Sequence, residues 1–220
     1  MDNTMMKQAD LLPFQAHATA RETGGRLPPN GPPVQLSLGQ EFDGSARRRL
    51  FLGIQLDAGA TRGLTRLMAE LRRGGIMPGR PVDPDRLHIT LHHLGDFADQ
   101  MPPSLIPTVN VAMATVKMQP FEVVCDRVGG TRGPFLLRAS DGSPALKIFR
   151  QTLSAALIEA GLRRYVDPVF NPHVTLSYDF SDTPEHIIEP ISWTVRQFVL
   201  IESLLGQHRH IVRGCWSIRD

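Results

Sequence analysis

The stretch NPHVTLSYDF (171–180) alternates apolar and polar side chains with the period of a β-strand. Successive side chains of a strand point to opposite faces, so its Val and Leu face one way while His173 and Thr175 face the other. A single histidine on a strand is most often a structural residue, and threonine is a good strand former. The polar face of this strand therefore needs a second observation before it indicates a site.

The stretch RLHITLHHLGDF (86–97) supplies that observation, because it repeats the order His-apolar-Thr-Leu. Side chains at i, i+2 and i+4 share one face of a strand, which places His88, Thr90 and His92 together. By the same rule, Ser177 extends the polar face of the first stretch. Two copies in matching apolar frames favour a functional site over coincidence.

Two imidazoles and two hydroxyls that converge suit a tetrahedral phosphate. A neutral imidazole accepts a proton from water, and a protonated one donates a proton to a leaving oxygen. Threonine hydroxyls can donate to the non-bridging oxygens, so this chemistry requires no metal and no cofactor. A zinc site at His88, His92 and His93 is disfavoured, because positions i and i+4 of a strand lie about 13 Å apart.

Strands and helices alternate along the chain, and the connections mix hairpins with helical crossovers. This mixture favours an α+β fold over a doubly wound parallel sheet. Each half of the chain has one helix followed by one His-x-Thr strand, which suggests internal duplication. The predicted strands are 49–56, 85–95, 121–130, 134–140, 172–180, 194–205 and 208–218, and the predicted helices are 60–75, 102–118 and 143–161.

The helix predicted at 143–161 has the clearest boundaries. Ser143 can cap its N-terminus, Pro144 suits its first turn, and Gly161 ends it. Its apolar stripe recurs at helical spacing and consists of Leu146, Phe149, Leu153 and Leu157.

Composition and length indicate a globular protein of one domain or two small ones. Of the 220 residues, 41% are hydrophobic and 21% are charged, as in ordinary globular proteins. The net charge of +2 is too small to predict bulk binding to nucleic acid or membranes. Cys125 and Cys215 lie in strand-like runs without a CxxC partner, so we expect two buried free thiols. No apolar run approaches the roughly 20 residues of a membrane span, and we expect a cytoplasmic protein without a membrane partner.

The first part of the chain differs from the rest. Residues 1–48 are rich in Gly and Pro and lack periodicity, which predicts a flexible N-terminal tail. The folded domain is expected at 49–220, with two similar lobes.

The paired motifs resemble those of the two-histidine (2H) phosphoesterase superfamily. The nearest branch is the bacterial and archaeal RNA 2′,3′-cyclic phosphodiesterases, historically named 2′-5′ RNA ligases. The likeness runs from about Arg49 to the C-terminus and includes RLFLGIQL at 49–56 and F-x-V-x-x-x-x-V-G at 121–129. It implies two similar lobes, each a mainly antiparallel sheet with outer helices, around a central cleft that holds the motifs.

The resemblance implies a role for each motif residue. His88 and His173 become the catalytic pair, with His88 as general acid and His173 as general base, and Thr90 and Thr175 become ligands of the phosphate oxygens. The implied activity is metal-independent hydrolysis of a 2′,3′-cyclic phosphate to a 2′-phosphate, with possible 2′-5′ ligation. The implied partners are RNA ends or small cyclic nucleotides, and we expect a monomer.

The chain departs from the family pattern at two positions. Relatives often have lysine where this chain has His92, and many have arginine where it has Tyr178. His92 is then a third polar group on the cleft floor or a solvated residue, and Tyr178 is a substrate contact or a core residue. Arg132 is the first candidate for a replacement cation on the substrate. Further candidates are Lys147, Arg163 and Arg164.

Other functions stay open at this point. The substrate of the same chemistry can be another small cyclic phosphate or a 2′-5′ linkage. A non-catalytic module that binds nucleotides or RNA is a different class, although a pure binder has no need of two proton-transfer groups.

Overall fold

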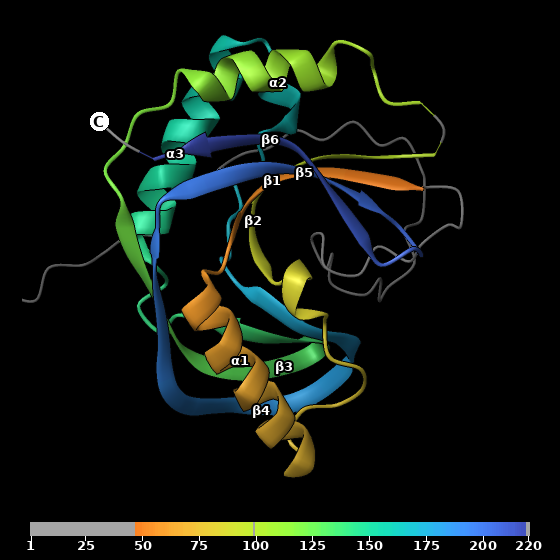
Figure 1. Cartoon of the computed structure of the whole chain (residues 1–220), viewed down its shortest axis with the longest axis vertical. Helices are drawn as coiled ribbons and strands as arrows, with labels where there is room; N and C mark the ends of the chain where they lie inside the picture. Colours follow the sequence, from red (N-terminus) through yellow and green to blue (C-terminus); the bar gives the residue numbers. More distant parts are fainter. Residues whose placement is uncertain (1–46, 99, 219–220) are drawn as a thin grey trace, which may run out of the picture. The chain divides into compact units, whose positions relative to one another are not determined.

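One six-stranded sheet organises the part of the chain that the structure describes. The structure is a computed structural model, and it describes residues 47–98 and 100–218. The strand order is β3-β4-β2-β1-β5-β6 with antiparallel pairing throughout, so the α+β prediction is confirmed (Figure 1). The strands are β1 (Arg48–Gln55), β2 (His88–Phe97), β3 (Phe121–Arg138), β4 (Val174–Val195), β5 (Gln197–Leu204) and β6 (Arg209–Ser217).

The predicted tail falls almost wholly outside the described residues. Only residues 47 and 48 of the range 1–48 are described, and β1 already begins at Arg48. The flexible tail and the domain boundary at 49 therefore stay predictions.

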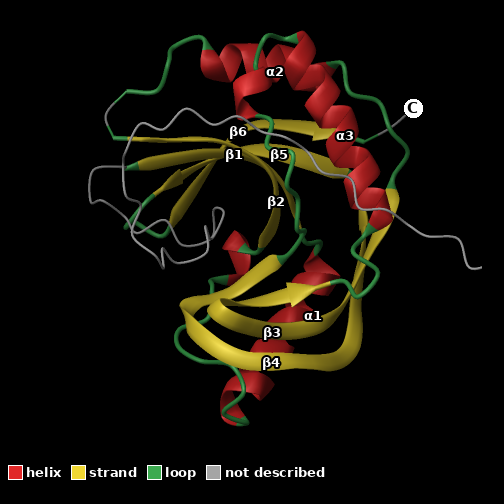
Figure 2. Cartoon of the chain, turned by 180° about the vertical axis from the view of Figure 1, so that it is seen from behind, coloured by secondary structure: helices red, strands yellow, loops and turns green. Residues whose placement is uncertain are grey.

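Three α-helices pack on the sheet within the described ranges. They are α1 (Ala58–Arg73), α2 (Leu105–Ala114) and α3 (Pro144–Glu159). α1 packs against β4, whereas α2 contacts α3 and β6, and α3 also contacts β3. Figure 2 shows α1 beside β3 and β4, and α2 and α3 at the other end near β6. The sheet thus has two halves, β1-β2-β5-β6 and β3-β4, with α1 on the second half and α3 in contact with both.

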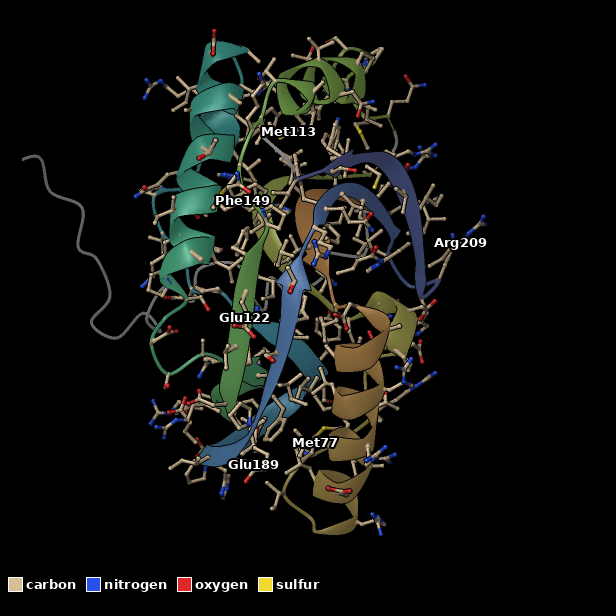
Figure 3. The ribbon with its side chains drawn as sticks, turned by 60° about the vertical axis from the view of Figure 1, so that its left-hand side comes forward. Met77, Met113, Glu122, Phe149, Glu189 and Arg209 are labelled. Carbon is tan, nitrogen blue, oxygen red and sulfur yellow. The ribbon has the colours of Figure 1, made fainter. Side chains whose placement is uncertain are left out.

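The stripe of α3 joins these halves in one core. All four predicted residues of the stripe are fully buried. The ring centroid of Phe149 lies 5.4 Å from that of Phe121 on β3 and 5.3 Å from that of Phe198 on β5 (Figure 3). Burial of one large apolar side chain contributes about 1.5–3 kcal/mol, so α3 is a main stabilising contact between the halves.

The start of α3 corrects one prediction. Ser143 makes no side-chain capping bond, and it adopts a left-handed conformation with φ of 50°. Its own N–H donates to Oδ1 of Asp141 at 2.7 Å instead. Pro144 begins the helix, and Gly161 follows its end with φ of 78°, both as predicted.

The strand boundaries of the second half also differ from the prediction. The strands expected at 121–130 and 134–140 form one strand, β3, and β4 continues to Val195. Glycines explain why the chain bends through this region without ending the strand. A Cβ on Gly129 would lie 2.9 Å from the Cα of Glu185 on β4, so only glycine permits the two backbones to approach this closely.

The cysteines and the helix lengths complete the comparison. Both cysteines are free, and Cys125 is buried as expected, but Cys215 on β6 is exposed. In the described ranges, no helix has the length and apolar character that crossing a membrane requires.

Candidate active site

The two halves of the sheet meet at one backbone bridge, and this bridge lies inside both His-x-Thr motifs. Ile89 of β2 pairs with Val174 of β4 in antiparallel orientation. Both side chains are buried in the core, so the residues on either side of them point to the opposite face. The structure thus brings together on one face the four predicted residues His88, Thr90, His173 and Thr175.

Antiparallel pairing defines which of these residues are neighbours. One residue to either side of the bridge partners, His88 lies opposite Thr175, and Thr90 lies opposite His173. Directly opposed residues have Cβ atoms about 4.5–5.5 Å apart, and diagonal neighbours such as the two histidines are about 7–8 Å apart. This spacing leaves room for one phosphate between the imidazoles.

Both imidazoles are oriented by the same backbone contact. Nδ1 of His88 lies 2.6 Å from the carbonyl oxygen of Arg86, and Nδ1 of His173 lies 2.7 Å from that of Asn171. A carbonyl oxygen only accepts, so each Nδ1 carries the proton and donates it. Each Nε2 is therefore left to act on a ligand.

Burial sets the protonation state of the pair. Burial is the main cause that lowers the pKa of His88 to about 4; the hydrogen bond to the carbonyl of Arg86 opposes it, and electrostatic repulsion from His173, Arg86 and Arg49 contributes to the lowering. Burial also lowers the pKa of His173. Both rings are therefore neutral near pH 7 in the ligand-free protein, and an anion bound between them favours the protonated form of either.

The rings of Phe51 and His210 form an aromatic cluster with the ring of His88. The ring of His88 stacks on Phe51 of β1 with centroids 4.7 Å apart, and His210 of β6 meets it edge-on at 5.4 Å. Gly53 makes the stack possible, because a Cβ there would lie 3.3 Å from the Phe51 ring and 2.9 Å from the carbonyl oxygen of Ile89. Burial lowers the pKa of His210 to about 3. His210 lies far from the motifs in the sequence, and no sequence pattern identified it.

A β-bulge follows the first motif and corrects the prediction for His92. In the β1–β2 register, Gly53 pairs with Thr90 and Leu52 with His92, so Leu91 has no partner. The extra residue reverses the alternation. His92 therefore points into the core with 2% exposure, where Nε2 lies 3.2 Å from the hydroxyl of Ser154. The expectation that His92 contributes to the cleft floor was wrong.

His93 occupies the motif face in place of His92. It pairs with Phe51, which stacks on His88, so its side chain lies on the same face of the sheet. Its Nε2 lies 2.9 Å from Oδ1 of Asp96. Asp96 also accepts two hydrogen bonds from the guanidinium of Arg49, at 2.8 and 2.7 Å.

A second bulge follows the second motif at the corresponding position. Leu136 pairs with Thr175 and Phe135 with Ser177, which leaves Leu176 without a partner. Ser177 is consequently buried, so its predicted place on the polar face was wrong. Tyr178 takes that place instead and is 57% exposed. The structure thus places Tyr178 on the face of Thr175, and its contact with substrate stays a prediction.

Arg150 of α3 connects the backbones of the two motif regions. Its Nε donates to the carbonyl oxygen of Leu91, the bulge residue, at 2.9 Å. Its Nη2 donates to the carbonyl oxygen of Asp167, in the loop that leads to His173. The guanidinium also lies 4.8 Å from the ring centroid of Phe170. Because Arg150 is only 8% exposed, these contacts form a buried link between the first motif and the approach to the second.

The cations near the histidines are not the ones that the sequence suggested. Arg49 and Arg86 act on the pKa of His88, and Arg138 acts on that of His173. Arg132 is exposed within β3, at the register shift between Thr131 and Gly133, and lies four residues before Leu136, or about 13 Å along an extended strand. Its contact with substrate stays a prediction. The other suggested cations, Lys147, Arg163 and Arg164, are exposed on α3 and on the short helix Arg163–Tyr165.

Two His-x-Thr strands joined at one bridge in an α+β fold are the arrangement expected of a 2H phosphoesterase. Comparison with family models gives the same result, since the model of the 2′-5′ RNA ligase superfamily matches residues 78–207. This match spans more than half of the chain, and the protein belongs to the 2′-5′ RNA ligase superfamily.

Solved structures share the fold. E. coli LigT in its apo form has a TM-score of 0.62 and 23% identity, over 80% of this chain and 100% of LigT. The Thermus thermophilus protein TT0787 has a TM-score of 0.61 and 23% identity, over 78% of this chain and 98% of its own. At this identity the likeness establishes the fold alone. Among proteins with curated annotation, none matches this chain.

Proposed function

We propose that the protein is a metal-independent phosphodiesterase that opens 2′,3′-cyclic phosphates on RNA ends or nucleotides. The observation that carries this proposal is the bridge between Ile89 and Val174. It sets two histidines with free Nε2 atoms and two threonine hydroxyls around a space of one phosphate.

The proposed reaction uses these groups as a base, an acid and two oxygen ligands. Nε2 of His173 takes a proton from water as the water oxygen bonds to phosphorus. The bond from phosphorus to the ribose 3′ oxygen breaks, and protonated Nε2 of His88 donates its proton to that oxygen. The products are a 2′-phosphate and a 3′-hydroxyl. A 5′-hydroxyl of RNA in place of water would give a 2′-5′ linkage by the same step.

The remaining groups stabilise charge in this scheme. The hydroxyls of Thr90 and Thr175 donate to the non-bridging oxygens, which carry the charge of the transition state. The cations that act on the histidines, Arg49, Arg86 and Arg138, would offset that charge at longer range. The bound anion also raises the lowered pKa of the general acid, so that substrate binding prepares its protonation.

The solved relatives support a ligand of this class. E. coli LigT has been crystallised with phosphate and, separately, with 3′-AMP. These ligands belong to LigT, and we extend their chemical class to this chain as part of the proposal.

The test is hydrolysis of 2′,3′-cyclic AMP by the wild type and by His88→Ala, His173→Ala and the double variant. Loss of a general acid or base lowers the rate by about 10²–10⁴-fold, and chelation of metals should leave the wild-type rate unchanged. The exposed His186 on β4 offers a matched control, since His186→Ala should keep full activity. Circular dichroism checks the fold of each variant. Wild-type turnover by the double variant would overturn the proposal, and binding of 2′-AMP without any turnover would favour a non-catalytic module.

A further inference from the structure

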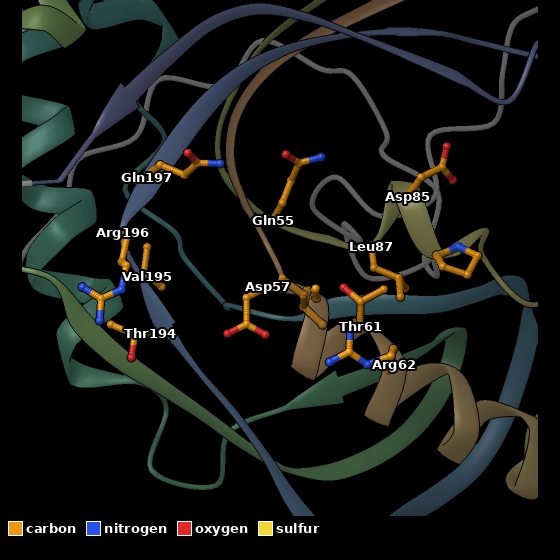
Figure 4. Close-up of a pocket in the computed structure, with 13 residues that line it drawn as sticks. Gln55, Asp57, Thr61, Arg62, Asp85, Leu87, Thr194, Val195, Arg196 and Gln197 are labelled. Carbon is orange, nitrogen blue, oxygen red and sulfur yellow. The ribbon is translucent and has the colours of Figure 1, made fainter.

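A cavity of about 870 Å³ lies at the end of β1 (Figure 4). Its walls are the end of β1 with the start of α1 (55–58, 61 and 62), three residues just before β2 (84, 85 and 87), and the junction of β4 with β5 (194–197). We call it the Gln55 pocket. None of the residues in the proposed reaction lines it, so its role is a separate question.

Two structural links connect the Gln55 pocket to the catalytic histidine. Gln55 is the register partner of His88, so the two side chains share one face of neighbouring strands. The segment 84–87 leads directly into β2, and the carbonyl oxygen of Arg86 in this segment accepts the Nδ1 proton of His88. The pocket thus begins on β1, the strand that pairs with the strand of His88.

The lining indicates a neutral, polar ligand with flat apolar faces. Two amides, of Gln55 and Gln197, and the hydroxyls of Thr61 and Thr194 can donate and accept hydrogen bonds. Apolar side chains complete the walls, among them Leu56, Leu87 and Val195. The two arginines of the pocket are balanced by two aspartates, so it does not select a polyanion. These balanced charges are Arg62, Arg196, Asp57 and Asp85.

Local bonds orient two of these groups. Oδ1 of Asp57 accepts from the N–H of Ala60 at 2.8 Å, so this carboxylate is engaged as the cap of α1. Oε1 of Gln197 accepts from the thiol of Cys215 at 3.8 Å. This bond uses one of the two lone pairs of the Gln197 oxygen and orients the amide, whose NH₂ group can donate to a ligand.

We propose that the Gln55 pocket binds the nucleoside that precedes the terminal, cyclic-phosphate nucleoside of an RNA strand. A base offers apolar faces and a hydrogen-bonding edge, a ribose offers hydroxyls, and the volume lies in the range of small-molecule sites, about 300–1,000 Å³. The terminal nucleoside lies between its cyclic phosphate and the preceding nucleoside, so the terminal one reaches the strand next to His88, where the pocket begins at Gln55. The preceding nucleoside then lies farther in, toward Gln197 on β5, two strands from His88. The inference rests on the proposed function and deepens it, because it makes RNA ends better substrates than mononucleotides.

The test compares two substrates, 2′,3′-cyclic AMP and a diadenosine that ends in a 2′,3′-cyclic phosphate. The wild type should show a higher kcat/KM for the dinucleotide than for the mononucleotide. Gln197→Leu should lower the ratio of these two kcat/KM values about tenfold, because it removes roughly one hydrogen bond to the dinucleotide. Gln207→Leu is the matched control, since Gln207 is exposed in the turn between β5 and β6, and it should leave the ratio unchanged. An equal kcat/KM for both substrates in the wild type, or an unchanged ratio in Gln197→Leu, overturns the inference.

Calorimetry with the products separates this inference from the proposed function. Diadenosine 2′-phosphate should bind the wild type more tightly than 2′-AMP, and Gln197→Leu should abolish that difference. If neither cyclic phosphate is hydrolysed but this pattern of binding holds, the proposed function fails and the pocket stands. If both are hydrolysed and the two products bind equally, the pocket fails and the proposed function stands.

Discussion

Arg150 links the two motifs, and its replacement by methionine tests that link. The substitution Arg150→Met removes the bonds to the carbonyls of Leu91 and Asp167 and the contact with Phe170. Hydrogen bonds to a charged group contribute about 1.5 kcal/mol or more each, and a cation–π contact about 0.5–1 kcal/mol. We expect a loss of about 3–4 kcal/mol in the free energy of unfolding. For a domain of this size that loss lowers Tm by roughly 10 °C.

The same variant should also impair catalysis. The bonds of Arg150 hold the bulge after Thr90 and the loop before His173, so their loss shifts the two imidazoles relative to each other. We expect kcat for 2′,3′-cyclic AMP to fall at least tenfold, with a small change in KM, in steady-state assays below the new Tm. Arg150→Lys keeps the charge but cannot span both carbonyls, and it should give intermediate values.

The control for this prediction lies on the same helix. Lys147 is exposed on α3, and Lys147→Met should leave both Tm and kcat unchanged. An unchanged Tm in Arg150→Met would refute the energetic argument. A lower Tm with full kcat at a permissive temperature would show that Arg150 stabilises the fold without positioning the motifs.

Three further predictions concern protonation and packing. The kcat/KM for 2′,3′-cyclic AMP should peak below pH 6.5 and fall on both sides of this maximum. Catalysis needs one protonated and one neutral ring, and burial lowers the pKa of both His88 and His173. A maximum in the alkaline range would contradict this. Burial also lowers the pKa of His92 to about 4, so the unfolded chain, with a pKa near 6.5, takes up the proton first as pH falls. The free energy of unfolding, measured by denaturant titration, should therefore fall between pH 6.5 and 4, and His92→Gln should reduce that slope; an equal slope in both proteins argues against a buried neutral ring. Gly53→Ala should lower the free energy of unfolding by about 1–3 kcal/mol and lower kcat, because the added methyl displaces Phe51 from His88. Unchanged Tm and kcat would show that the stacked rings of Phe51 and His88 tolerate the methyl group.

The sequence predicted the parts of the site that depend on local alternation. His88 and Thr90 share a face because no irregularity separates them, and the same holds for His173 and Thr175. Beyond each motif, a bulge interrupts the alternation of side chains between the two faces of the strand. The alternation of polar and apolar residues in the sequence continues through that position, so the sequence does not reveal the bulge. His92 was therefore misplaced for a physical reason, since a bulge is set by the register with a neighbouring strand.

The supporting residues required the tertiary fold. His210 reaches His88 from β6, at the far edge of the sheet, and Arg150 reaches both motif regions from α3. Neither has a sequence pattern of its own. The helix and strand types were predictable from periodicity, whereas the continuity of β3 depended on the close approach of Gly129 to β4.

The central claim is that both motifs serve a single phosphate. A crystal structure of the protein with 2′-AMP tests it most directly. The account predicts phosphate oxygens within about 2.6–3.2 Å of Nε2 of both His88 and His173, with the hydroxyls of Thr90 and Thr175 on the remaining oxygens. A phosphate that contacts only one of the two histidines, or that binds elsewhere on the protein, would contradict the account.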